Sequence, residues 1–369
     1  MKSAIPNSKS TFLSNWRRPI LGALALSLIG APALGSGCAA SFDPPTQIQT
    51  LRILAVTPDK PYPAPGDTVN FQMTLQDGYA EGETGIRPIQ IVWLGGCFNP
   101  PADQYFLCYE QLAKVFGALA GGPPSPEVLQ YIGIGNEFNL KIPEDIVSGR
   151  PPPMTGPHYG LSYIFFAACA GEIKPVLPEG TGAAPDFPLG CFDENGNQLG
   201  AESFVPGYTQ VYSFADGREN QNPIIGGMSL NDKPMSDADE EIPLVEACPV
   251  TEDERREAGC NAKDTTACKT YTIKLQLEPS VAEIDPDGKG KDGEALTEAV
   301  WVSYFTDRGN IGPGIKLVND PVEGFNADLA TSYLPPDTTG FATIWAVVRD
   351  ARGGSAVLRR YVNVQPSVP

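Results

Sequence analysis

Residues 51–78, "LRILAVTPDKPYPAPGDTVNFQMTLQDG", decide the fold class. From residue 69 onward every second residue is apolar and its neighbours are polar, which is the period of a strand with one buried face. Residues 65–67, Pro-Gly-Asp, supply the turn that separates this strand from the apolar run before it. The stretch therefore predicts two strands joined by a turn, and the core side chains of the second are Val69, Phe71, Met73 and Leu75.

Short strand-like segments continue beyond this stretch. They are 87–96, in which Trp93 is placed to fill a sandwich core, followed by 136–146, 159–171 and 208–215. Their order resembles the immunoglobulin-like sandwich of bacterial surface lipoproteins, and "GLSYIFFAAC" (160–169) is similar to its late F strand. The second strand has no cysteine to pair with Cys169, so the resemblance is to the architecture and not to the antibody disulfide. The first predicted domain is 49–218.

An insertion, 98–137, interrupts this domain. Residues 109–120 have helical spacing, and "SPEVLQYI" begins like a helix with Ser125 as N-cap and Pro126 at the first position. We expect a small helical insertion, held by a Cys97–Cys108 disulfide. It either carries binding function or covers an edge of the sandwich, and the sequence leaves both open.

A second series of strands fills 219–369. It begins with 222–231 and the strictly alternating 271–279, and an acidic, cysteine-containing loop (236–267) interrupts it after the first strand. The last pair of strands resembles the closing hairpin of bacterial immunoglobulin-like and PKD-like modules, with turn residues Asp350, Gly353 and Gly354. The prediction is an all-β chain of two immunoglobulin-like β-sandwich domains in tandem, with a small helical insertion in the first.

The first 37 residues predict a signal peptide. Four basic residues and no acidic one precede an apolar run at 20–29, which is too short to span a bilayer. "LGSGC" (34–38) resembles the bacterial lipobox, which implies a lipid on Cys38 and a tether over 38–48, although Gly35 stands where that motif usually has Leu. Cleavage after Ala33 would instead leave a free soluble protein. Residue 39 is not Asp, so we expect an exported protein that is lipid-anchored to the cell envelope, with the outer membrane favoured.

Eight cysteines in an exported chain favour disulfides. Lipidation of Cys38 leaves seven, an odd number, so one thiol is free or paired between chains. Proximity predicts Cys97–Cys108 and Cys169–Cys191, and one pair among the last three. The seven candidates are Cys97, Cys108, Cys169, Cys191, Cys248, Cys260 and Cys268.

The net charge of −18 excludes nucleic acid as a partner. Removing residues 1–37 removes four of the 26 basic residues, so 22 face 44 acidic ones and the mature charge is −22. No basic stripe offsets this charge. The remaining partners are the membrane, through the N-terminal lipid, and an unidentified envelope protein or glycan.

No catalytic constellation stands out. His158 is the only histidine, which excludes a three-histidine zinc centre, and its setting "TGPHYG" indicates a turn. The chain has no GxSxG motif, and 44 acidic residues always offer pairs without singling out two for glycoside hydrolysis. Calcium is the one weak cofactor candidate, in "DENGN" and "DPDGKGKD", where plain Asx turns account for the same residues. Its candidate ligands are Asp193, Asn195, Asn197, Asp285, Asp287 and Asp292.

These observations predict a non-catalytic, membrane-anchored envelope lipoprotein that serves adhesion, scaffolding or protein binding. The alternative is an extracellular carbohydrate-binding module or hydrolase that uses the 98–137 insertion. Four aromatic residues there either stack on sugar rings or pack the insertion onto the sandwich: Tyr105, Phe106, Tyr109 and Tyr131.

Overall fold

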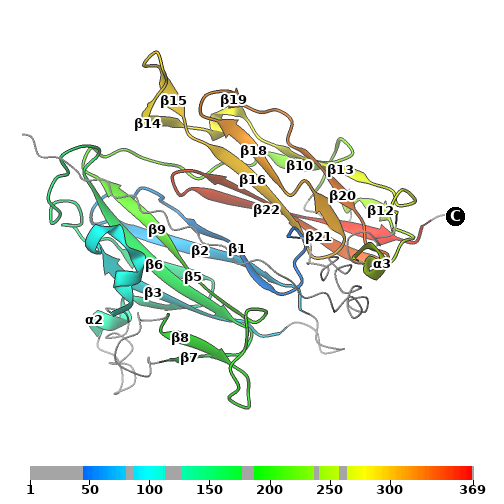
Figure 1. Cartoon of the computed structure of the whole chain (residues 1–369), viewed down its shortest axis with the longest axis horizontal. Helices are drawn as coiled ribbons and strands as arrows, with labels where there is room; N and C mark the ends of the chain where they lie inside the picture. Colours follow the sequence, from blue (N-terminus) through cyan, green and yellow to red (C-terminus); the bar gives the residue numbers. More distant parts are fainter. Residues whose placement is uncertain are drawn as a thin grey trace, which may run out of the picture.

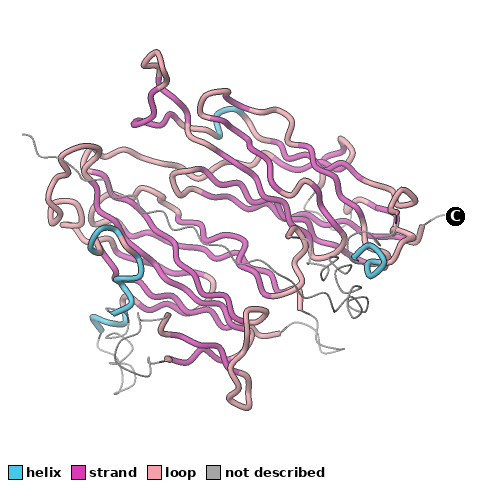
Figure 2. The backbone as a smooth tube through the Cα atoms, in the orientation of Figure 1, coloured by secondary structure: helices cyan, strands magenta, loops and turns pink. Residues whose placement is uncertain are grey.

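The computed structural model describes residues 45–79, 87–110, 112, 126–176, 187–236, 241–256 and 264–367. Strands form nearly all of its regular structure, which confirms the all-β fold class (Figures 1 and 2). The predicted signal peptide, Cys38 and most of the tether lie outside the described residues.

The first sandwich is built from two antiparallel sheets. One sheet has the order β1-β2-β5, with β1 (Leu51–Pro58), β2 (Thr68–Asp77) and β5 (Glu137–Lys141). The other has the order β4-β3-β6-β9, with β4 (Ile132–Ile134), β3 (Gln90–Phe98), β6 (Tyr159–Cys169) and β9 (Phe204–Phe214). Lettered along the chain, strands A, B and E face C′, C, F and G, which is an immunoglobulin-like arrangement.

Trp93 occupies the centre of this sandwich, as the sequence predicts. Its ring is fully buried and lies 5.8 Å from the ring of Phe138 and 5.6 Å from that of Phe166. The indole Nε1 donates a hydrogen bond of 2.7 Å to the carbonyl of Gly135, so its one polar group is satisfied. Phe71 of β2 and Phe166 of β6 pack against this indole. In antibody domains the two equivalent strands, B and F, are joined by a disulfide.

Part of the predicted insertion belongs to the sheet. β4 pairs with β3, so residues 132–134 form an edge strand of the sandwich and are not a peripheral insertion. Among the described residues of the insertion, helical structure comprises the 3-10 turns Pro101–Asp103 and Tyr105–Cys108, residues 109, 110 and 112 of a helix, and α2 (Pro126–Leu129). Most of 109–120, together with Ser125, lies outside the described residues. The sequence also missed a hairpin of β7 (Glu172–Pro175) and β8 (Leu189–Phe192).

The second sandwich also has two sheets. One has the order β11-β10-β13-β20-β17, with β11 (Lys233–Pro234), β10 (Gly227–Leu230), β13 (Tyr271–Gln276), β20 (Ala330–Leu334) and β17 (Asn310–Gly312). The other has the order β12-β22-β21-β16-β18-β19, with β12 (Leu244–Glu246), β22 (Ser355–Gln365), β21 (Gly340–Asp350), β16 (Val300–Thr306), β18 (Ile315–Asp320) and β19 (Gly324–Phe325).

The final hairpin, β21 and β22, turns where the sequence predicts. Asp350 accepts the N–H of Gly354 at 2.7 Å, which closes the turn with a side-chain bond. Gly353 takes a positive φ of 100°, a conformation that a side chain would strain. The turn residues therefore act in the way that their chemistry predicts.

Two segments of this domain differ from the prediction. The acidic loop 236–267 contains β12, which pairs in parallel with β22, and α3 (Glu252–Arg256). Asp285 and Asp287 lie on β14 (Ile284–Lys289), which forms a hairpin with β15 (Ala295–Thr297). Three-residue strands and strands rich in Asp, Pro and Gly have no periodic signal, so their partners and not their own sequence define them.

The two sandwiches lie side by side, as Figure 1 shows. β1 and the residues before it pack on the outer face of the sheet that contains β21 and β22. The buried side chains of this contact, here called the interdomain core, are Ile48, Leu54, Ala55, Trp345 and Val347. Next to it Gln47 pairs with Thr306 in parallel, and Ile48 N donates to Thr306 O at 2.8 Å.

The segment that joins the domains is hydrogen-bonded to both. Asn222 Nδ2 donates to the carbonyl of Pro58 at 2.6 Å, and Asn222 Oδ1 accepts from Ser355 N at 2.9 Å. Thr57 and Ser355 join their hydroxyls at 2.8 Å, and the guanidinium of Arg349 donates to Leu54 O. The connection therefore acts as part of the interface and not as a free linker.

Replacement of Val347 by Asp tests the interdomain core. A carboxylate at this position is buried without a partner while the two sandwiches are in contact, which is energetically costly. Because Val347 faces out of its own domain, separation of the sandwiches exposes the carboxylate to water without unfolding that domain. We expect a larger radius of gyration by small-angle scattering with unchanged strand content by circular dichroism. Val348, the next residue, faces the second sandwich core, so Val348→Asp should unfold that domain. An unchanged radius of gyration in the Val347→Asp variant would show that contacts other than the interdomain core keep the two domains together.

Candidate functional site

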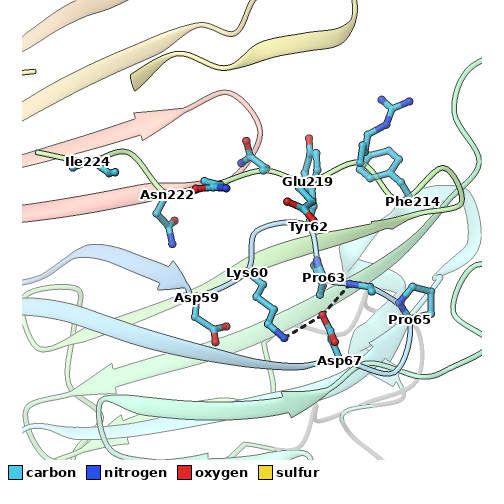
Figure 3. Close-up of a pocket in the computed structure, with 15 residues that line it drawn as sticks. Asp59, Lys60, Tyr62, Pro63, Pro65, Asp67, Phe214, Glu219, Asn222 and Ile224 are labelled. Carbon is cyan, nitrogen blue, oxygen red and sulfur yellow. Dashed lines mark hydrogen bonds and ion pairs between the residues drawn. The ribbon is translucent and has the colours of Figure 1, made fainter. Parts of the chain in front are cut away.

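A groove of about 610 Å³ lies where the two sandwiches meet, and we call it the junction groove (Figure 3). The loop after β1, residues 59–67, forms one wall, and the connection 214–224 forms the other. Asp67 holds the loop by accepting the Ala64 N–H at 3.2 Å and pairing with Lys60 Nζ at 3.1 Å. The opposite wall carries the exposed side chains of Glu219 and Ile224.

Aromatic rings form the inner part of the groove. Tyr62 lies 4.8 Å from Phe214 and 6.4 Å from Tyr212, measured between ring centroids. A second hollow of about 510 Å³ continues past Tyr62 along Tyr159 and Tyr212 to the β21–β22 turn. Burial raises the pKa of Tyr62 to about 12, so its phenol stays neutral at physiological pH.

Arginines cover the faces of these rings and join the domains electrostatically. Arg218 lies 4.7 Å from the centre of the Phe214 ring, and Arg352 lies 5.7 Å from that of Tyr62. Arg218 pairs with Asp216 at 2.6 Å and with Asp287 of β14 at 2.5 Å.

Arg352 pairs with Glu298 at 2.8 Å and with Glu283 at 2.5 Å. Both guanidinium groups are therefore neutralised by carboxylates of the protein. The groove presents aromatic rings and ion pairs to its surroundings.

A second polar cluster lies beside the groove. Asp103 Oδ2 accepts from Arg150 Nη2 at 2.9 Å and from the Tyr159 hydroxyl at 2.7 Å. Burial alone would raise the pKa of Asp103, but these bonds and the Arg150 charge hold it below its usual value. His158 Nε2 lies 2.8 Å from the carbonyl of Arg150, so the only histidine is engaged at a turn and not beside a nucleophile within the described residues.

The predicted calcium loops form turns. Asp193 Oδ1 accepts from Asn195 N at 2.9 Å and from Asn197 N at 2.7 Å, which is an Asx turn. Asp285 accepts from Asp287 N at 3.0 Å, whereas the Asp287 carboxylate pairs with Arg218. Asp292 N donates to Glu294 at 3.0 Å. In the part of the chain that the structure describes, no three metal-ligating side chains gather, and calcium binding stays an untested prediction.

Three disulfides are present among the described residues. Cys97–Cys108 and Cys169–Cys191 are the pairs that proximity predicts, and Cys248–Cys268 is the pair formed among the last three cysteines. Cys38 and Cys260 lie outside the described residues. Disulfides of this number are typical of exported proteins.

The aromatic residues of the insertion mostly pack onto the sandwich. Tyr105 stacks on Tyr208 with 4.4 Å between ring centroids, and Tyr109 lies 5.6 Å from Phe165. Tyr131 lies 6.0 Å from Phe98. Phe106 is 46 % exposed. Three of the four rings therefore cover the outer face or edge of a sheet.

The sequence did not single out the residues of the junction groove. The available signal was Tyr62, an aromatic residue between two prolines in a loop, together with Arg218 in the connection between domains. Neither residue has a motif around it, because the groove is assembled from two segments, 59–67 and 214–224, that are distant in sequence.

No helix among the described residues has the length and apolarity to cross a membrane. No protein-family model matches the chain, and no curated protein matches its sequence.

Similar solved structures include the D00–D0 domain of intimin, at 12 % identity, covering 86 % of this chain and 98 % of that one, with a TM-score of 0.20. Another is a Ca²⁺-stabilized adhesin of an Antarctic bacterium, at 11 % identity and a TM-score of 0.20, covering 88 % of this chain and 51 % of the adhesin. A third is the C-terminal domain of the Streptococcus agalactiae AgI/II polypeptide BspA, at 11 % identity, covering 85 % and 99 %, with a TM-score of 0.18. Similarities with TM-scores this low do not support a fold assignment, so we assign the fold from the order of the strands in the two sheets.

Asp103→Asn tests the polar cluster beside the groove. The lowered pKa of Asp103 means that its stabilisation is present above the unfolded pKa of about 3.9 and is lost as pH falls through the folded value. Asn also tolerates the positive φ of 56° at this position. We expect a loss of about 1–3 kcal/mol in unfolding free energy at pH 7, which shrinks as the pH falls below the unfolded pKa of about 3.9.

Denaturant titrations at several pH values measure this loss. Glu127→Gln, on the exposed surface of α2, is the control and should change stability by less than about 0.5 kcal/mol. A loss that is the same at pH 7 and pH 2.5 would contradict an electrostatic origin.

Proposed function

We propose that the chain is a non-catalytic envelope lipoprotein that serves adhesion or binds another envelope protein through the junction groove. Support comes from the leader sequence with its lipobox-like end and from the disulfides. The arginines of the groove are already paired, and the only histidine bonds to a main-chain carbonyl. Such a surface is suited to contact and not to proton transfer.

The single observation that carries this proposal is the position of the groove relative to the start of the described chain. Thr46 and Gln47 bond to Ile311 and Thr306, at the end of β16. The hollow that continues the groove reaches Asp350, which pairs with Val300 at the other end of β16. β1 ends at Pro58, whose carbonyl accepts a hydrogen bond from Asn222 of the groove. A lipid on Cys38 would hold residue 45 within about 25 Å of the membrane, because an extended chain spans at most about 3.6 Å per residue. The groove would then face away from the bilayer.

Ring packing does not support the alternative of a carbohydrate site in the 98–137 insertion. The Tyr105 ring stacks on Tyr208 of β9, and the Tyr109 ring packs edge-to-face with Phe165 of β6. A protein partner at the junction groove is therefore the better-supported function.

Mass spectrometry of the mature N-terminus from native membranes tests the anchor. We expect the first peptide to begin at Cys38 and to carry a thioether-linked diacylglyceryl group. Cys38→Ala should release the protein from the membrane fraction, whereas Ser36→Ala, which keeps a small residue before the cleavage site, should not. An unmodified peptide beginning at Leu34 would contradict lipidation and indicate a soluble protein.

Photo-crosslinking in the native cell tests the groove. A crosslinking residue in place of Glu219, on the groove wall, should give a discrete adduct with an envelope protein. The same residue in place of Glu194, exposed in the turn after β8, should not. Ile224→Asp should abolish the adduct, because Ile224 is 80 % exposed on the rim and its replacement leaves folding intact. Equal adducts from both positions, or no adduct from position 219, would contradict binding there.

A further inference from the structure

Another hollow, of about 840 Å³, lies on the other side of β1 from the aromatic rings, and we call it the interdomain cleft. Its walls are the strands β2 and β22, which belong to different sandwiches. Thr57 and Ser355, whose hydroxyls lie 2.8 Å apart, both line the cleft, so it lies against a contact that joins the domains. It is therefore a built feature of the interface and not a gap between loosely placed domains.

Four polar side chains of this cleft have no hydrogen-bonded protein partner among the described residues, whereas Thr57, Gln76 and Ser355 are hydrogen-bonded. Gln72, Asn136 and Arg359 are exposed, and Thr74 is half-buried. Among the described residues, none of these four side chains makes a hydrogen bond or ion pair with another protein group; Arg359 contacts only the ring of Tyr361. This contrasts with the junction groove, where Asp67 and Arg218 are already paired. The cleft thus offers amide, hydroxyl and guanidinium groups in positions that a ligand can use.

The floor beneath these groups is apolar. Trp345 is 3 % exposed at the bottom, and Leu75 and Val357 flank it, half-buried. An apolar floor with a few polar groups above it is the usual composition of a small-molecule site. A ligand here needs an apolar face as well as many hydrogen-bonding groups.

Charge narrows the class of ligand. The chain carries 44 acidic residues, yet among the described residues no carboxylate lines the cleft, and the one charged side chain found there is that of Arg359. A cationic ligand has no counter-charge here, and a polyanion has only one. Gln and Asn side chains both donate and accept, which matches hydroxyl groups that also do both. An added peptide strand is disfavoured, because the Met73 N–H of β2 is already bonded to the Asn136 carbonyl at 2.8 Å.

We propose that the interdomain cleft binds an oligosaccharide that is neutral or carries one negative charge. Its pyranose faces lie over the half-buried side chains of Leu75 and Val357, and its hydroxyls bond to Gln72, Thr74 and Asn136. Arg359 pairs with a single carboxylate where one is present. This goes beyond the protein-binding role of the junction groove, since it concerns a different surface and a different class of ligand.

Calorimetric titration of the full mature chain tests the proposal. The probes are cello-, malto-, chito- and galacto-oligosaccharides of three to six units, the same set with one terminal uronic acid, and a heparin fragment as polyanion. We expect at least one neutral or singly anionic probe to bind and the heparin fragment not to bind. Gln72→Ala and Asn136→Ala should each weaken binding about tenfold.

Two further variants test whether the sugar occupies the cleft or another part of the surface. Arg359→Ala should remove any preference for the uronic acid probes and leave neutral ones unaffected. Gln221→Ala, in the junction groove, should leave binding unchanged, and melting curves confirm that all variants are folded. The absence of binding by the whole panel would overturn the proposal. So would binding that the Gln72 and Asn136 variants leave unchanged, or preferential binding of heparin. None of these results depends on the crosslinking at Glu219.

Discussion

The packing of β1 against Trp345 and Val347 determines most of what this molecule presents to its surroundings. β1 belongs to the first sandwich, where Leu51 enters the core, yet Leu54 and Ala55 face the second sandwich. A register shift between Ile53 and Ala55 makes this possible, because an irregular strand can aim neighbouring side chains at different faces. One strand thus serves two cores, and both the junction groove and the interdomain cleft lie along it.

The parts of the fold that follow from local sequence were predictable, and the parts that depend on distant partners were not. β2 and β13 alternate strictly and bury the expected face, and Trp93 fills the first core. In contrast, β12 has three residues and exists because β22, more than a hundred residues later, pairs with it. The side-by-side packing of the domains could not be predicted from a sequence pattern either. β1 buries residues on both of its faces, so its apolar residues do not alternate regularly with polar ones.

The same reason explains why the candidate site escaped the sequence. Tyr62, the pair Phe214 and Arg218, and Arg352 come from three separate segments, and only folding brings the two rings to 4.8 Å from each other. The sequence drew attention instead to the aromatic residues of the insertion. Tyr105 and Tyr109 are used there to cover the sheet, and Phe106 alone remains largely exposed. Aromatic content alone does not separate a binding surface from a covering layer.

The buried carboxylates of the described residues serve structural contacts. A general acid or base needs a shifted pKa and a free proton site in a groove. Burial raises the pKa of Glu298 and of Asp307, but Glu298 bonds to Arg352 and to Glu283 N, and Asp307 accepts the Thr343 N–H. Neither lines the junction groove or the interdomain cleft. Where the described chain perturbs a carboxylate most by burial, it uses that carboxylate to hold backbone in place.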